Sequence, residues 1–326
     1  MRAVELRAGA GRIAMTAFLP DLAALSGCVI FAAPGGGYSR GYYNMRFDGH
    51  SGYSQAEHHT GQGHVVLAYD HLGVGDSEIG DLSAHTVETI AHANHAAVRE
   101  VQSLIRQGEL CDGFPALPNA FHVGIGQSMG GCVSIVMQAQ HRTFDAICVL
   151  GYSAIHTMLP QRTLFDLEAA KQQYAYGRAT SPNELSVARS SAGVADFIYP
   201  FHWEDVPADI LAADMEGGYP LRRTAPPFGS LTIPNCAVAM MGKGFVADDA
   251  RAIEAPVFAA FGERDVSAEP RAEPQAFGAS DDVTVLVVPR MAHMHNFAGT
   301  RRRLWDRLSA WVSDQARSAR IARKDS

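Results

Sequence analysis

The chain has 326 residues, 47% of them hydrophobic and 19% charged, with a formal net charge of -7 at pH 7. This is a globular composition, and the negative charge argues against nucleic acid as the main partner, because phosphate binding needs a basic face. The five cysteines are widely spaced and odd in number, which argues against a disulfide framework and favours reduced thiols.

The N-terminal residues lack the basic-then-apolar order of a signal peptide, and no apolar run approaches the roughly 20 residues that span a membrane. We therefore expect a soluble cytoplasmic protein with no membrane partner.

Short apolar runs alternate with turns through the first half of the chain. The predicted strands cover residues 4–6, 13–18, 28–33, 64–70 and 121–126. Residues 83–107 repeat apolar side chains at three- and four-residue steps, which predicts an amphipathic helix. A second helix is predicted over residues 129–140, directly after the fifth strand.

The second half of the chain loses this regularity and then regains it. A strand is predicted at 146–153, but residues 155–235 mix aromatics, prolines and short helical pieces. Strands at 255–262 and 282–289 and a helix at 303–317 follow.

Strands of continuous apolar character that alternate with helices indicate an α/β protein, with a mostly parallel sheet and helices on both faces. We predict a core domain of residues 1–154 and 236–326, interrupted by an inserted cap domain of residues 155–235.

The sequence Gly126-Gln127-Ser128-Met129-Gly130 lies where a predicted buried strand turns into a helix. The pattern G-x-S-x-G at such a junction is typical of a nucleophile elbow, which raises the serine hydroxyl above the sheet. The two glycines remove side chains that would collide across the turn. The pattern therefore predicts Ser128 as a nucleophile.

A serine hydroxyl needs a base to take its proton, and the base needs an acid to orient it. Asp265 follows the predicted strand 255–262, and His293 follows the strand 282–289. The carboxyl ends of parallel strands meet at one edge of a sheet. The order Ser128, Asp265, His293 is the order that this architecture uses, and it predicts a catalytic triad.

Two alternatives stay open for the triad. His295 lies two residues beyond His293 and could serve as the base in its place. Asp281 or Asp282 could serve as the acid, although both precede a strand rather than follow one.

Acyl transfer also needs amide groups that bind the developing oxyanion. The N–H of Met129, directly after the nucleophile, is the first predicted donor. The glycine-rich loop 34–38 follows an early strand, where the second donor is expected, and we name Gly36 first and Gly37 second. A flexible turn is the alternative for this loop. His92 and His95 share a helix face with His85 nearby, but no carboxylate accompanies them at metal spacing. We predict no metal and no cofactor.

Several stretches together resemble the α/β-hydrolase superfamily: YDHLGVGDS (69–77), GQSMGG (126–131), FGERD (261–265) and MAH (291–293). Most relatives carry His-Gly after the early strand, where this chain has Pro-Gly-Gly-Gly (34–37). This loop, the chain length and the compact cap resemble the bacterial zearalenone lactonases, which open the macrocyclic ester of a fungal resorcylic lactone. The resemblance implies an α/β-hydrolase fold and a serine hydrolase that cleaves a carboxylic ester or lactone through an acyl-enzyme.

An aromatic, mostly apolar small molecule is the expected substrate. Tyr38 and Trp203 are the predicted substrate contacts, supported by Phe201, Tyr42 and Tyr43 nearby in the sequence. The alternative for Trp203 is that it only packs the cap. The same triad would also serve an acyltransferase or a carbon–carbon bond hydrolase, and a ligand receptor on a hydrolase scaffold is the non-enzymatic alternative. A homo-oligomer stays open.

Overall fold

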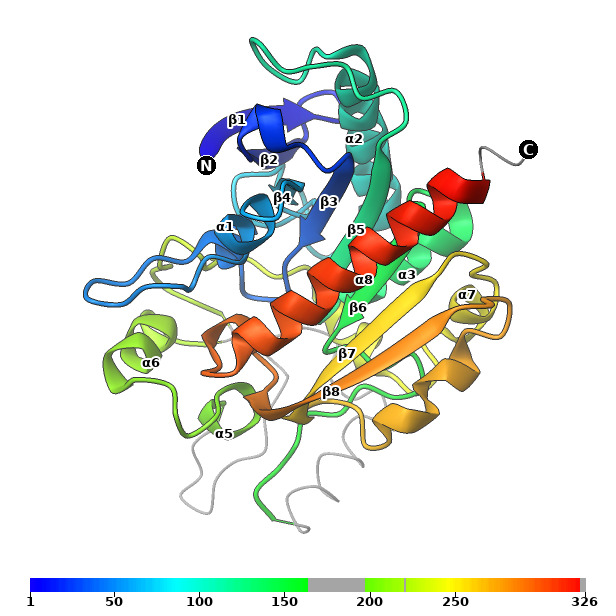
Figure 1. Ribbon diagram of the computed structural model, residues 1–326. Coiled ribbons are helices and arrows are strands. Elements are labelled where there is room, and N and C mark those ends of the chain that lie inside the picture. Colours follow the sequence, from blue (N-terminus) through cyan, green and yellow to red (C-terminus); the bar gives the residue numbers. More distant parts are fainter. Residues whose placement is uncertain (164–196, 220, 323–326) are drawn as a thin grey trace.

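The computed structural model describes residues 1–163, 197–219 and 221–322 (Figure 1). Its centre is an 8-stranded sheet in the order β1-β2-β4-β3-β5-β6-β7-β8. The strands are β1 (Arg2–Ala8), β2 (Ile13–Leu19), β3 (Cys28–Ala33), β4 (Val65–Tyr69), β5 (Phe121–Gln127), β6 (Ala146–Leu150), β7 (Val257–Arg264) and β8 (Val283–Ala292). Strand β2 runs antiparallel to β1 and β4, and every other pair is parallel. The predicted mostly parallel sheet is confirmed.

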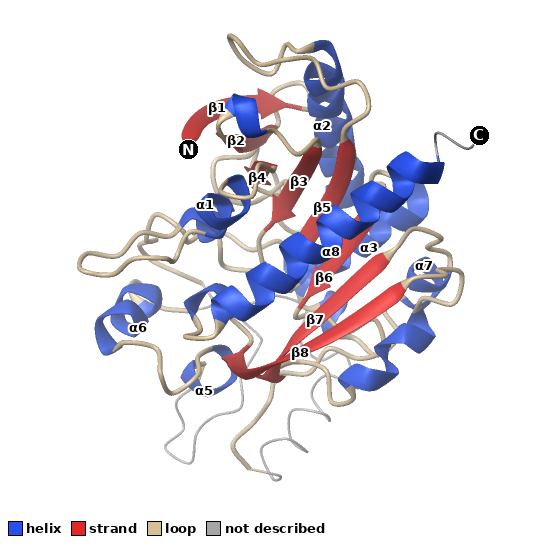
Figure 2. Ribbon diagram, viewed as in Figure 1, coloured by secondary structure: helices blue, strands red, loops and turns tan. Residues whose placement is uncertain are grey.

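Helices cover both faces of this sheet (Figure 2). Helices α2 and α3 pack together on one face, while α1 and α8 cover the other. The α-helices are α1 (Gln55–Thr60), α2 (Val87–Gln107), α3 (Met129–His141), α5 (Ile198–Phe201), α6 (Ala208–Met215), α7 (Ala247–Arg251) and α8 (Arg301–Ala322). Short 3-10 helices are Leu22–Ala24, Arg40–Asn44, Asn235–Ala237, Ala239–Met241, Pro270–Ala276 and His295–Phe297. None of the helices in the described part of the chain is long and apolar enough to cross a membrane.

Strand β3 illustrates why the central strands read as continuous apolar runs. Val29 and Phe31 point into the core on the side of α2 and α3, whereas Ile30 and Ala32 point into the core on the side of α8. All of these side chains are buried. A strand with helices on both faces has no solvent side, so its sequence does not alternate.

Element boundaries differ from the predicted ones where backbone geometry decides them. The strand predicted at 146–153 ends at Leu150, because Gly151 takes a positive φ of 59° that ends the extended run. Helix α2 begins at Val87 rather than at residue 83, because Thr86 and Thr89 form a capping box there, and Gly108 with a φ of 79° ends it.

The chain between β6 and β7, residues 151–256, is called here the β6–β7 segment. Its helices α5 and α6 lie beyond the carboxyl ends of β7 and β8 (Figure 1). The predicted cap, residues 155–235, falls within this segment, and its residues 164–196 and 220 lie outside the described residues. The arrangement brings the β6–β7 segment to the edge of the sheet where the candidate catalytic residues are expected.

We expect the stability of this fold to fall in mild acid. His64 is buried, its Nδ1 lies 2.8 Å from Ser26 Oγ, and burial lowers its pKa from 6.5 to about 4. Because the folded-state pKa lies below the unfolded one, the folded chain binds fewer protons between pH 6.5 and pH 4. The resulting stabilisation, roughly 3 kcal/mol from this group, is present above pH 6.5 and lost as the pH falls to 4.

Urea unfolding of the wild type and of His64→Gln at pH 7, 5.5 and 4.5 measures this effect. The variant should lose less of its unfolding free energy across this range than the wild type does. Equal losses in both proteins would assign the acid sensitivity to other groups.

Candidate active site

Ser128 stands on a sharp bend between β5 and α3. Its φ of 53° and ψ of -117° lie outside the regions that non-glycine residues favour. A Cβ at Gly126 would lie 2.1 Å from the Gly130 carbonyl oxygen, and one at Gly130 would lie 2.3 Å from the Ala33 oxygen. Both flanking residues must therefore be glycine for the bend to form.

His293 links Ser128 to Asp265. Its Nε2 lies 3.0 Å from Ser128 Oγ, and its Nδ1 lies 2.7 Å from Asp265 Oδ1. A carboxylate accepts hydrogen bonds only, so Nδ1 carries the proton and Nε2 is left to accept the serine hydroxyl hydrogen. Two hydrogen bonds fix the backbone of His293. Its carbonyl accepts from Gln127 Nε2 at 3.1 Å, and its N–H donates to the Pro200 carbonyl at 3.1 Å.

Asp265 is a buried carboxylate with every oxygen occupied. The amides of Gly262 and Val266 each donate to it at 2.8 Å. His295 Nε2 lies 2.6 Å from Oδ2, on the side away from His293. Burial alone would raise the pKa of Asp265, but the imidazoles of His295 and His293 hold it well below its usual value. These contacts favour the anionic form of Asp265.

The alternative histidine and the alternative acids occupy different positions relative to Ser128. His295 contacts the second oxygen of Asp265, whereas His293 is the histidine within hydrogen-bond distance of Ser128. Asp281 and Asp282 precede β8 and lie at the opposite end of that strand from His293. Asp282 accepts a hydrogen bond from Gln315 instead.

The glycine-rich loop lies beside the serine. The Tyr38 N–H donates to the Gly35 carbonyl at 3.2 Å and closes a tight turn, in which Gly37 has a φ of 82° that glycine alone adopts readily. A Cβ at Gly35 would lie 3.1 Å from Ser128 Cβ. Met129 is the first residue of α3, so its N–H has no partner within the helix.

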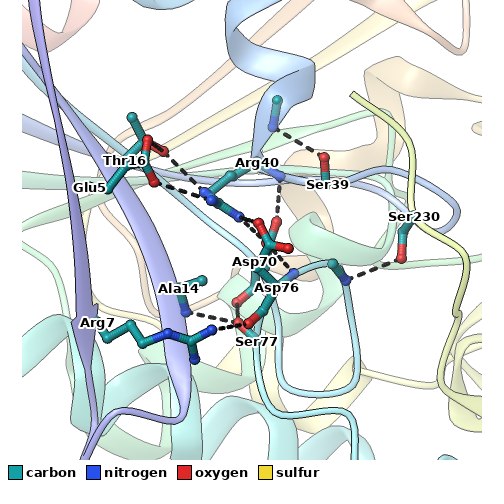
Figure 3. A network of polar contacts seen from close by, with 12 residues as sticks. Glu5, Arg7, Ala14, Thr16, Ser39, Arg40, Asp70, Asp76, Ser77 and Ser230 are labelled. Atoms are coloured by element: carbon teal, nitrogen blue, oxygen red, sulfur yellow. Dashed lines mark hydrogen bonds and ion pairs between the residues drawn. The ribbon is translucent and has the colours of Figure 1, made fainter. Parts of the chain in front are cut away.

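A network around Arg40 anchors the chain that follows this loop (Figure 3). The guanidinium pairs with the buried carboxylate of Asp70, with Asp76 at 2.8 Å and with Glu5 at 3.1 Å. The Arg40 N–H donates to Asp70 as well. Because Asp70 directly follows β4, the network ties the loop after β3 to the end of the neighbouring strand.

A cavity opens above Ser128, and its described lining is mainly apolar. Gly36, Met129 and His293 border it close to the serine. Further out, its lining includes Phe197, Phe201, Tyr219, Met240, Met241 and Met294. Among the described lining residues there is no Asp, Glu, Lys or Arg.

The two predicted substrate contacts, Tyr38 and Trp203, are not among the described residues that line this cavity. Tyr38 is fully buried and donates its hydroxyl hydrogen to Asp214 at 2.7 Å. Trp203 packs against the guanidinium of Arg264, 4.7 Å from the ring centroid. Phe201, their neighbour in the prediction, does border the cavity, with its ring centroid 5.3 Å from that of His293.

Sequence reasoning missed most of the cavity wall. Phe197, Tyr219, Met240 and Met241 come from the β6–β7 segment, where apolar residues have no regular spacing and so no periodic signal. Gln127 could have been singled out, because it occupies the first variable position of the G-x-S-x-G pattern. In the described part of the chain, no group of three or more His, Cys, Asp or Glu side chains is arranged to hold a metal ion.

No protein-family model and no curated protein matches the chain, but solved structures do. A thermostable carboxyl esterase from Bacillus coagulans is 16% identical, with 97% of this chain and 98% of that chain covered and a TM-score of 0.64. A thermophilic esterase from Thermogutta terrifontis is 15% identical, with coverage of 97% and 100% and a TM-score of 0.60. A proline iminopeptidase from Mycobacterium smegmatis is 17% identical, with coverage of 98% and 100% and a TM-score of 0.57.

Together with the sheet order, these likenesses over nearly the whole of each chain decide the fold class. The chain has the α/β-hydrolase fold. The fold expected from the sequence is confirmed, whereas the finer resemblance to zearalenone lactonases is not shown by these comparisons. At such low identities the likeness concerns the fold, and the chemistry has to be argued from the site.

We expect Gly126→Ala to destabilise the protein, because the new methyl group would meet backbone atoms of the elbow that cannot move aside. Overpacking of this kind costs about 1–3 kcal/mol of unfolding free energy. Gly278→Ala is the matched control, because its Cβ would make only an ordinary contact of 3.7 Å with the Arg251 side chain. Denaturant unfolding of the three proteins compares them, and equal stability of Gly126→Ala and wild type would contradict the close packing at the elbow.

Proposed function

We propose that this protein is a serine hydrolase that cleaves a carboxylic ester or lactone through an acyl-enzyme. One observation carries the proposal: His293 Nε2 lies 3.0 Å from Ser128 Oγ, and His293 Nδ1 lies 2.7 Å from Asp265 Oδ1. Ser128 itself occupies a strained backbone turn between a strand and a helix. A hydroxyl, a base and an anionic orienting group in this geometry are the parts that nucleophilic acyl transfer needs.

In the acylation step, Ser128 Oγ attacks the carbonyl carbon of the substrate while His293 Nε2 takes the hydroxyl proton. Asp265 keeps the proton of the imidazole on Nδ1 and stabilises the imidazolium that forms. The oxyanion is bound by the N–H of Met129 and by an amide of the glycine loop, Gly36 or Gly37. The tetrahedral intermediate then expels the alcohol, to which His293 returns the proton.

In the deacylation step, water takes the place of the alcohol. His293 Nε2 accepts a proton from the water as its oxygen attacks the acyl carbon, and Ser128 leaves with that proton. With a lactone substrate the alcohol remains tethered to the acyl group. The net reaction adds one water molecule to the ester bond.

The cavity favours a neutral, apolar substrate. Binding a charged group there would remove it from water without a counter-charge in the described lining, which costs several kcal/mol. An aminopeptidase has to bind the free ammonium group of its substrate, and the described lining offers no carboxylate for it. An ester, as for the two esterases among the structural neighbours, therefore suits this site better than an N-terminal peptide.

The macrolactone of zearalenone is the specific substrate that we propose for testing. Its resorcylic ring is aromatic, and the rings of Phe197, Phe201 and Tyr219 stand in the cavity wall with centroids 5.0–5.7 Å apart. Within this proposal, residues 155–235 form a cap that decides which substrate enters.

We expect Ser128→Ala to lower kcat/KM on an aryl ester by at least about a thousandfold, because no other hydroxyl contacts His293 Nε2 in the described residues. A fluorophosphonate probe should label the wild type and not the variant. Ser134→Ala is the matched control, since Ser134 is a buried serine of α3, the helix that begins directly after Ser128. Full esterase activity in Ser128→Ala would refute the mechanism.

A second experiment tests the substrate. Wild type and Phe201→Ala are compared on zearalenone, on a long-chain aryl ester and on an aryl acetate. Because Phe201 borders the cavity, its truncation should raise KM about tenfold for the two large substrates and less for the acetate. Mass spectrometry detects the opened lactone. Aryl ester hydrolysis with no opening of zearalenone would remove that substrate and leave the serine hydrolase standing.

A further inference from the structure

In the glycine loop beside Ser128, the carbonyl groups of Pro34, Gly35, Gly36 and Gly37 are all hydrogen-bonded, although three of these four residues are glycines with little conformational preference. Each acceptor has its own donor: Pro34 O accepts from His71 Nε2 at 2.9 Å, Gly35 O from Tyr38 N at 3.2 Å, Gly36 O from the Tyr219 hydroxyl at 3.2 Å, and Gly37 O from Ser230 N at 3.0 Å and Arg222 Nε at 3.3 Å. The donors come from three separate parts of the chain.

Holding a carbonyl oxygen also holds the next N–H, because the peptide group is planar and trans. The bond to Gly35 O therefore orients the N–H of Gly36, and the bond to Gly36 O orients the N–H of Gly37. In the part of the chain that the structure describes, neither of these amides donates to a protein acceptor. Both are free to bind an anionic oxygen.

The Gly36–Gly37 peptide is the unit of this loop that most needs to be held. Glycine on both sides lets the peptide rotate at little steric cost. A rotated peptide would turn its carbonyl oxygen, the negative end of its dipole, toward the place where negative charge develops. The Tyr219 hydroxyl donates a hydrogen bond to the Gly36 carbonyl oxygen and so opposes this rotation. Burial raises the pKa of Tyr219, so the hydroxyl stays protonated and remains a donor.

Tyr219 is itself fixed by a buried ion pair of the β6–β7 segment. Arg222 NH2 lies 3.0 Å from Asp214 Oδ1, and both side chains are fully buried. The guanidinium carbon of Arg222 lies 5.2 Å from the centroid of the Tyr219 ring and 5.3 Å from that of Tyr38. Asp214 also accepts from the Tyr38 hydroxyl at 2.7 Å and lies 2.8 Å from His202 Nε2. One compact cluster thus joins Tyr219 to the end of the glycine loop.

We propose that Tyr219 is a positioning residue of the active site, which holds the Gly36–Gly37 peptide in the orientation that binds the oxyanion. The Arg222–Asp214 pair holds Tyr219 against the loop. The inference rests on the proposed function, and it makes the β6–β7 segment a part of the catalytic apparatus as well as a wall of the substrate cavity.

Tyr219→Phe tests this role, because it removes one oxygen atom and keeps the ring with its contacts to Arg222 and Phe201. We expect kcat on an aryl ester to fall about tenfold, equivalent to about 1.4 kcal/mol of transition-state stabilisation, while KM changes less than about twofold. The inhibition constant of an aryl boronic acid, which forms a tetrahedral adduct on a serine, should rise by the same factor. The fraction of Ser128 labelled by a fluorophosphonate at completion should stay that of the wild type.

Tyr69→Phe is the control, because Tyr69 is a buried tyrosine whose hydroxyl meets only Met137 Sδ, at 3.9 Å, in the described residues. It should keep wild-type kcat and wild-type boronate inhibition. A merely structural role of Tyr219 would lower the melting temperature and leave the boronate inhibition constant unchanged.

Wild-type kcat in Tyr219→Phe, or a loss confined to KM, would overturn the inference while the serine hydrolase proposal stands. A wild-type protein that neither hydrolyses esters nor reacts with the fluorophosphonate would overturn both. The two failures are therefore distinguishable in one set of measurements.

Discussion

The buried carboxylate of Asp265 is the group on which the geometry of the site depends. An ion removed from water is costly unless hydrogen bonds replace its hydration, and here two amides and two imidazoles do so. The Gly262 amide belongs to β7 and the Val266 amide to the turn that follows this strand, so the anion is built into the edge of the sheet. Its charge sets the tautomer of His293, and the tautomer leaves Nε2 facing Ser128. His295 completes the coordination of the carboxylate and thereby narrows the positions that it can occupy.

Strain at Ser128 is the second constraint, and the rest of the fold overcomes it. A non-glycine residue at such backbone angles costs of the order of 1–3 kcal/mol. The cost is met because β5 lies between β3 and β6 and α3 packs against this part of the sheet, so that both sides of the bend are fixed independently of it. Gly126 and Gly130 permit the close approach that this requires. The same junction gives the Met129 amide its unpaired position at the helix start.

Sequence could predict those parts of the site that follow from local pattern. Ser128, Asp265 and His293 each follow a strand that is apolar on both faces, so their proximity is a consequence of parallel topology. The wall of the cavity follows from no such rule. Phe197 and Tyr219 reach the cavity wall through the packing of the β6–β7 segment, in which apolar residues do not recur at regular intervals along the sequence. Tyr38 shows the same limit from the other side: its place after the glycine loop suggests a substrate contact, but its hydroxyl meets the buried Asp214, which no local pattern connects to it.

The β6–β7 segment therefore does more than form a wall of the substrate cavity, because it also holds groups of the candidate active site in place. The segment holds the glycine loop through Tyr219, Arg222 and Ser230, and it holds the candidate catalytic histidine through the bond from the His293 amide to the Pro200 carbonyl. Glycine has little conformational preference, so a glycine loop alone does not fix the orientation of its amide groups. Hydrogen bonds from another element have to fix it. Where that element also borders the substrate cavity, a change of cavity shape alters the loop as well. If the protein is the proposed hydrolase, we expect its substrate range and catalytic rate to be coupled, because Tyr219 both borders the cavity and holds the glycine loop.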